Sequence, residues 1–145
     1  MPLKVVIDTN VLLVSISSRS RYHPIFQAFL KDAFILCVTT DILEEYEEIF
    51  GQPHHLGFKT TQDVLEVIDN ALNVVLVTKF FRWNLIETDP DDNKFVDCAV
   101  ACNANYIVTN DRHFNVLKEI DFPQTRIINI DGFLDLLDSL TAHSK

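Results

Sequence analysis

The sequence predicts an α/β domain in which helices cover both faces of a parallel five-stranded sheet. Short runs of apolar and β-branched residues recur along the chain, and segments with the helical spacing of apolar residues separate them. The length of 145 residues fits a single domain over residues 1–145, without an internal repeat or a linker. A hydrophobic content of 48% is sufficient to build a core, which argues against disorder.

Five apolar runs are expected to form the strands. The first of them ends abruptly at Asp8 and is apolar enough to be a buried central strand. Parallel strands joined by helices are expected because a helical segment follows almost every run. The expected strands are Leu3–Ile7, Phe34–Val38, Val74–Thr78, Tyr106–Val108 and Arg126–Ile130.

The intervening segments are expected to be helical, on the basis of apolar spacing and of residues that favour helix starts. Thr40 and Asp41 are candidate N-caps of the helix that ends at Phe50. Polar stretches between helices, such as Ser17–Pro24, are expected to be loops. The expected helices are Asn10–Ser17, a segment through Ile25–Leu30, the helix ending at Phe50, Thr61–Leu72, Asp91–Asn103, a short helix at His113–Lys118, and Gly132–Leu140.

Charge and composition restrict the partners and the setting. A net charge of −9 argues against broad, nonspecific binding of polyanions, although metal ions can neutralise an acidic nucleic-acid site. A basic protein partner is compatible with this charge. The N-terminus does not resemble a secretory signal, no apolar run is long enough to span a membrane, and three cysteines form no disulfide framework. A cytoplasmic location is therefore expected.

Four carboxylates that are distant in sequence are expected at one edge of the sheet. Parallel α/β sheets bind ligands at the carboxyl ends of their strands, where the N-termini of the neighbouring helices also lie. Asp8 and Asp111 follow two of the strands, and Glu45 and Asp92 lie in the opening turns of two helices. Helical phase places Asp92 on the apolar side of its helix and directs Asp97 towards solvent.

The same phase analysis favours Glu45 over Glu44, which remains the alternative. Cys98 and Cys102 fall on the apolar face of their helix, so they are expected to be core residues rather than metal ligands. Clustered carboxylates repel one another unless a cation compensates them, and hard oxygen ligands favour Mg²⁺ or Mn²⁺. Such ions can activate water and stabilise a departing oxyanion at a phosphodiester.

The stretches "VVIDTNVLL", "ILEEYEEI" and "DPDDNKFVDCAVACNANYIVTNDRHF" resemble those of the PIN-domain ribonucleases. The likeness is closest to the toxin components of type II toxin–antitoxin systems, and it extends over essentially the whole chain. The resemblance implies a three-layer α/β/α fold with strand order 3-2-1-4-5. It also implies an endoribonuclease that depends on Mg²⁺ or Mn²⁺ and hydrolyses RNA.

Carried over residue by residue, the resemblance assigns the acids Asp8, Glu45, Asp92 and Asp111 as catalytic. Asp8, Asp92 and Asp111 are the expected metal ligands, and Glu45 acts through a second ion or through water. Further positions in the motifs order the site or compete for these roles. They are Thr9, Asn10 and Thr109 as supporting residues, Asp91 as the alternative to Asp92, and Asn110 as the alternative to Asp111.

The resemblance also implies partners other than RNA. A small DNA-binding antitoxin would place a helix across the acidic edge, and a homodimer is a candidate oligomeric state. Two other functions stay open. A phosphotransfer hydrolase would use Asp8 as its nucleophile, although that chemistry usually requires a second acid where Asn10 stands. A catalytically inactive PIN-like interaction domain would keep the fold without the reaction.

Overall fold

The computed structural model describes residues 2–143, and side-chain positions up to residue 140. It contains a parallel sheet of five strands in the order β3-β2-β1-β4-β5, which confirms the predicted fold class and strand order. The strands are β1 Lys4–Ile7, β2 Ile35–Val38, β3 Val74–Leu76, β4 Tyr106–Val108 and β5 Ile127–Ile128.

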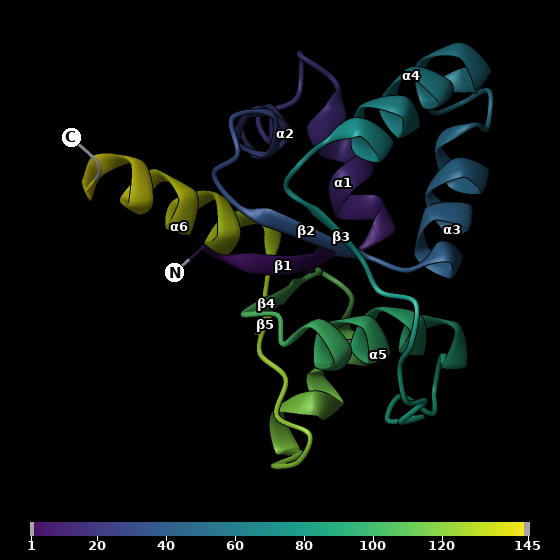
Figure 1. The fold of residues 1–145 in the computed structure, drawn as a ribbon, viewed down its shortest axis with the longest axis vertical. Helices are drawn as coiled ribbons and strands as arrows, with labels where there is room; N and C mark the ends of the chain where they lie inside the picture. Colours follow the sequence, from purple (N-terminus) through teal and green to yellow (C-terminus); the bar gives the residue numbers. More distant parts are fainter. Residues whose placement is uncertain (1, 144–145) are drawn as a thin grey trace.

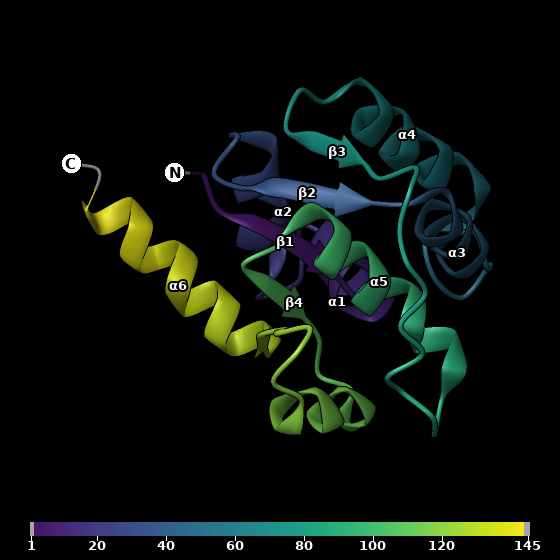
Figure 2. The same ribbon diagram turned by 60° about the horizontal axis from the view of Figure 1, so that its bottom comes forward.

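Helices cover both faces of this sheet. The helices are α1 Thr9–Ile16, α2 His23–Leu30, α3 Thr40–Phe50, α4 Gly57–Asn70, α5 Asn93–Cys102 and α6 Ile130–His143, with 3₁₀ helices η1 Pro90–Asp92 and η2 Arg112–Glu119. Helix α5 packs on one face against β1, β2 and β4, whereas α1 and α2 lie on the other face (Figures 1 and 2). The sheet is therefore the middle of three layers, as the sequence predicts.

Strand β1 is the middle strand of the sheet, and its side chains are buried on both faces. Val5, Val6 and Ile7 are inaccessible to solvent, which matches the continuous apolar run expected of a strand between two helical layers. Ile7 pairs in register with Val108 of β4, so the next residues of the two strands, Asp8 and Thr109, also lie side by side. The register thus places the first predicted acid beside the segment that carries the last.

Aromatic side chains fill the core on the side of α1 and α2. Phe34 packs edge-on against Phe133 of α6, with ring centroids 5.3 Å apart. Tyr46 of α3 stacks on Phe50 at 5.4 Å, and its hydroxyl donates a 2.5 Å hydrogen bond to the Ile7 carbonyl oxygen. This hydrogen bond satisfies a buried carbonyl at the tip of β1, directly before Asp8.

Several element boundaries differ from the predictions. The N-cap of α3 is Thr39 rather than Thr40 or Asp41, since the Thr39 hydroxyl accepts a hydrogen bond from the Ile42 amide. Helix α4 begins at Gly57, before the predicted Thr61. Asp92 closes a 3₁₀ turn instead of lying inside the following helix, which begins at Asn93. The 3₁₀ turn adds a tight bend in front of α5 and changes which carboxylates can meet.

The prediction from helical phase was wrong for Asp97. The prediction directed it to solvent, but its side chain is buried and accepts a 3.0 Å hydrogen bond from the Trp83 amide. The connection between β3 and η1 crosses this face of α5, and the helical period of α5 carries no information about that connection. Burial raises the pKa of Asp97, while the bond from Trp83 favours its charged form.

Candidate metal centre

Asp8 lies at the tip of β1, with only 9% of its surface exposed. It occupies the N-cap position of α1, but its side chain makes no capping hydrogen bond there. Instead, the Thr109 hydroxyl donates a 2.7 Å hydrogen bond to Asp8 Oδ2, and that hydroxyl also accepts a 3.0 Å bond from the Asp111 amide. The contacts of the carboxylate therefore differ from those of an ordinary helix cap.

The environment of Asp8 disfavours its negative charge. Burial raises the pKa of Asp8, the hydrogen bond from Thr109 opposes that shift, and the charges of Glu45 and then Asp111 raise the pKa further. A carboxylate that is buried among other carboxylates costs free energy unless a cation neutralises the group.

Asp92 lies at the end of η1, and its side chain is 14% exposed. Its Oδ2 atom is buried and has no hydrogen-bond partner among the residues that the structure describes. Burial, followed by the charges of Asp89, Asp111 and Asp8, raises the pKa of Asp92 to about 7. An unpartnered buried oxygen next to three further acids is a position where a bound cation would remove an electrostatic penalty.

Asp91, the alternative to Asp92, has a different environment. Its side chain is 72% exposed and forms a 3.0 Å ion pair with Lys94. The hydrogen bond from Lys94 lowers the pKa of Asp91, so its charge is already compensated. Of the two adjacent acids, Asp92 is the one that lacks a lysine or arginine partner among the described residues, and its ionic contact is with His113.

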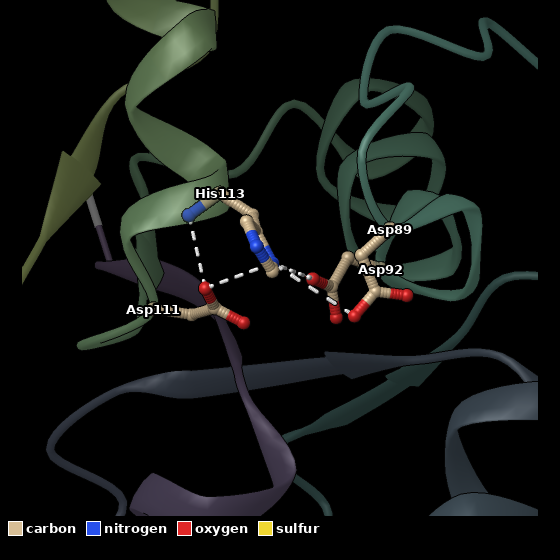
Figure 3. Close-up of side chains that lie close together, drawn as sticks. All are labelled: Asp89, Asp92, Asp111 and His113. Atoms are coloured by element: carbon tan, nitrogen blue, oxygen red, sulfur yellow. Dashed lines mark hydrogen bonds and ion pairs between the residues drawn. The ribbon is translucent and has the colours of Figure 1, made fainter.

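A compact group of four side chains brings Asp92 and Asp111 together with Asp89 and His113 (Figure 3). One donor atom from each lies within 4.8 Å of those of the other three. Asp111 is the N-cap of η2, and its Oδ1 accepts a 2.9 Å hydrogen bond from the His113 amide. Two segments that are adjacent only in space, the turn around η1 and the start of η2, thus contribute two members each.

Glu45 lies beside this group but outside it. Its Oε2 accepts a hydrogen bond from the Thr9 hydroxyl, and its Oε1 forms a 2.8 Å ion pair with Lys94 Nζ. Burial alone would lower the pKa of Lys94, but its bonds to Glu45 and Asp91 outweigh burial and raise that pKa. Glu45 therefore has a lysine partner within the protein, whereas the ionic contact of Asp92 is with His113.

The structure thus brings Asp92 and Asp111 into one group, with Asp8 adjacent through electrostatic contact and through Thr109. Asn10, predicted as a support, is exposed in the first turn of α1. Asp89 was not among the predicted site residues, although an acid three residues before Asp92 across a proline-containing turn was a usable signal. The ion pair of Lys94 with Glu45 was not predicted either.

The cysteines lie apart from the acidic edge. Cys37 and Cys98 are buried and Cys102 is half-buried between β2 and the end of α5, and all three are free thiols. This arrangement agrees with the predicted core role of Cys98, while Cys102 is only partly covered.

None of the helices within residues 2–143 combines the length and apolar character needed to cross a membrane.

The donor set suits a hard divalent cation. Carboxylate oxygens predominate, and one of them is buried without a hydrogen-bond partner among the described residues. Burial, followed by mutual repulsion, raises the pKa values of Asp8 and Asp92. The fold and the site together define a parallel α/β domain with a carboxylate-lined edge suited to such a cation.

The chain belongs to the PIN domain family, whose model matches residues 4–113. Its fold is similar to that of a chain in VapBC2 from Rickettsia felis, whose crystal structure contains a DNA fragment from the promoter. That chain is 16% identical, with a TM-score of 0.57 and coverage of 88% of this chain and 98% of the other. The PIN domain endonuclease Utp24 is also 16% identical, with a TM-score of 0.50 and coverage of 88% and 85%. No curated protein sequence matches the chain.

Thr109→Val is expected to weaken binding of Mn²⁺ by about 10–100-fold, the usual cost of losing a residue that orients a metal ligand. Valine keeps the shape of threonine but removes the donor to Asp8 and the acceptor for the Asp111 amide. Titration calorimetry measures the affinity. Thr61→Val is the matched control, because the Thr61 hydroxyl is buried without a partner in α4. Equal affinities of the two variants would contradict a positioning role.

Proposed function

We propose that the chain is an endoribonuclease that depends on Mg²⁺ or Mn²⁺ and acts as the toxin of a toxin–antitoxin pair. The single observation that carries the proposal is the buried, unpartnered Oδ2 of Asp92 at an edge shared with Asp8 and Asp111. Membership of the PIN domain family and the fold likeness to Utp24, an endonuclease, support the same class of reaction. The fold likeness to a VapBC2 chain supports an antitoxin as the protein partner.

In this proposal, Asp8, Asp92 and Asp111 hold the cation, and Thr109 keeps the Asp8 carboxylate in place. The bound cation would polarise the phosphodiester and lower the pKa of a water molecule. Thr9 and Lys94 hold Glu45 in place beside the group of four side chains. From this position Glu45 would orient water at the edge of the site. The ammonium of Lys94 pairs with Glu45 and Asp91, which would reduce the repulsion between these acids and a substrate phosphate.

A cleft next to the acids offers a path for the RNA strand. It has a volume of about 590 Å³ and runs from Thr109 and Asp111 along η2 towards β5. Arg112 and Lys118 line it and supply positive charge on a chain that is acidic overall. Side-chain amides at Asn110, Asn115 and Asn129 add hydrogen-bonding groups for bases or sugars.

Cleavage of single-stranded RNA by the purified chain tests the proposal. The wild type should cut RNA with added Mg²⁺ or Mn²⁺ and stop when EDTA removes the ion. Asp8→Asn should lower the rate at least ~100-fold, because ligand loss removes several kcal/mol of transition-state stabilisation. Asp138→Asn, an exposed acid on α6, is the matched control and should keep the wild-type rate. Equal rates for wild type and Asp8→Asn would rule out this site.

Two alternatives have separate outcomes. A phosphotransfer hydrolase would leave a covalent acyl-phosphate on Asp8, which mass spectrometry detects. In the structure Asn10, which stands where that chemistry needs its second acid, is exposed at the start of α1. An inactive interaction domain would bind no divalent cation in calorimetry.

If the purified chain cleaves RNA, cleavage mapping on total RNA would identify its target.

A further inference from the structure

His113 is the one nitrogen donor in the group of four side chains. Its Nδ1 atom lies 3.2 Å from Asp111 Oδ1, 3.7 Å from Asp92 Oδ2 and 3.8 Å from Asp89 Oδ2. Figure 3 shows the ring between Asp111 on one side and Asp89 and Asp92 on the other. With 46% of the side chain exposed, the imidazole has access to solvent, yet Nδ1 faces the carboxylates.

The start of η2 holds this arrangement in place. The His113 amide donates to Asp111 Oδ1, so the backbone of His113 orients the same carboxylate that its ring faces. The neighbouring side chain Phe114 is fully buried and contacts Phe95 of α5, with ring centroids 6.4 Å apart. The packing of Phe114 thus anchors the turn that presents His113 to the acids from the η1 side.

The spacing of the donor atoms suits coordination of one ion. Two ligands on opposite sides of a small divalent cation are separated by about 4.0–4.4 Å, since each bond measures about 2.0–2.2 Å. The four donor atoms here, three oxygens and one nitrogen, lie within 4.8 Å of one another. The group therefore offers four candidate ligands to one ion.

We propose that His113 coordinates the cation through Nδ1 and that this nitrogen makes the site prefer Mn²⁺ or another first-row transition ion to Mg²⁺. The inference rests on the proposed function, because it concerns the same acidic site. Imidazole is a poor ligand for Mg²⁺, which favours oxygen ligands and retains its waters, whereas transition ions accept nitrogen readily. Asp89 adds a carboxylate from the opposite segment, so that the group of four offers one nitrogen and three oxygens in addition to Asp8.

Pulsed electron paramagnetic resonance of the full chain with one equivalent of Mn²⁺ tests the coordination directly. The wild type should show the electron–nuclear coupling of a ligated imidazole nitrogen, and His113→Gln should lose it. His55→Gln, which alters an exposed loop histidine, is the matched control and should keep the coupling. Absence of the coupling can be judged from the wild type alone, so that outcome does not depend on the folding of a variant. Mn²⁺ bound without nitrogen coupling would overturn the role of His113 and leave the proposed nuclease intact.

Calorimetry with Mn²⁺ and Mg²⁺ tests the preference. The wild type should bind Mn²⁺ more tightly than Mg²⁺, and His113→Gln should reduce the ratio of the two affinities by about tenfold or more. His113→Asn serves as a second variant if the first folds poorly. An unchanged ratio in a folded variant would overturn the inference. Absence of any Mn²⁺ binding by the wild type would overturn both the inference and the proposed function.

Discussion

Asp92→Asn is expected to raise the melting temperature of the metal-free protein at pH 8 by about 2–12 °C, and to abolish the ion-dependent cleavage expected of the proposed nuclease. The raised pKa of Asp92, about 7, means that folding places this carboxylate where its charge is unfavourable. Asparagine keeps the shape and removes the charge. The expected gain is about 1–3 kcal/mol, after allowance for screening by solvent, and each kcal/mol raises the melting temperature by about 2–4 °C at this size.

The pH dependence has a defined sign. Because the folded-state pKa of Asp92 lies above its ordinary value of 3.8, the folded chain holds this proton more tightly than the unfolded chain between about pH 4 and pH 7. The contribution of Asp92 to the free energy of unfolding therefore falls as the pH rises through that window. The advantage of the asparagine variant should be small near pH 4, grow up to about pH 7 and stay constant above it.

Thermal denaturation in EDTA and in excess Mn²⁺ measures these effects. Because Mn²⁺ would bind the folded state and not the unfolded state, excess Mn²⁺ should raise the melting temperature of the wild type. The melting temperature of Asp92→Asn should stay almost unchanged. Asp91→Asn is the adjacent control. Since Lys94 lowers the pKa of Asp91, neutralising this acid should give no stabilisation. A lower melting temperature for Asp92→Asn in EDTA at pH 8 would contradict the assigned electrostatic penalty.

Tyr46→Ala is expected to cost about 3–5 kcal/mol of unfolding free energy, the range for loss of a buried aromatic ring. The ring is fully buried and stacks on Phe50, so alanine leaves a cavity behind α3. Tyr46→Phe removes only the hydroxyl and leaves the Ile7 carbonyl oxygen without its 2.5 Å donor, which should cost about 1–3 kcal/mol. Urea unfolding at constant m-value measures both losses.

Tyr106→Phe is the control for removal of the Tyr46 hydroxyl. Tyr106 is half-buried at the start of β4, on the opposite end of the sheet from the acids. Its replacement should change the unfolding free energy by no more than about 0.5 kcal/mol. Similar losses for Tyr46→Phe and Tyr106→Phe would show that the bond to Ile7 contributes little.

The fold was predictable because the strands carry strong local signals. Apolar runs between helical segments identified all five strands, and the resemblance supplied their order, which the structure confirms. The edge strand β5 is reduced to Ile127–Ile128, within the predicted Arg126–Ile130, because an edge strand pairs with only one neighbour. Boundaries of helices were less accurate, since caps and 3₁₀ turns depend on a few hydrogen bonds.

The location of the acidic edge followed from topology, but its detailed contacts did not. Strand ends and helix starts were enough to predict Asp8, Glu45, Asp92 and Asp111 at one edge, and their catalytic roles remain predictions. The partners of these residues depend on side-chain reach between elements, as with the ion pair of Lys94 and Glu45. The inclusion of Asp89 and His113 depends on how the η1 and η2 turns face each other, which helical period does not encode.

The hydrogen bond between Thr109 and Asp8 joins residues 101 positions apart in the chain. The ribosome makes Asp8 well before the carboxylates that would share its ion, which come from residues 89–111. Until β4 has emerged and paired with β1, a nascent polypeptide contains Asp8 but no assembled site. In the proposed nuclease, synthesis of Asp8 would therefore precede assembly of the active site.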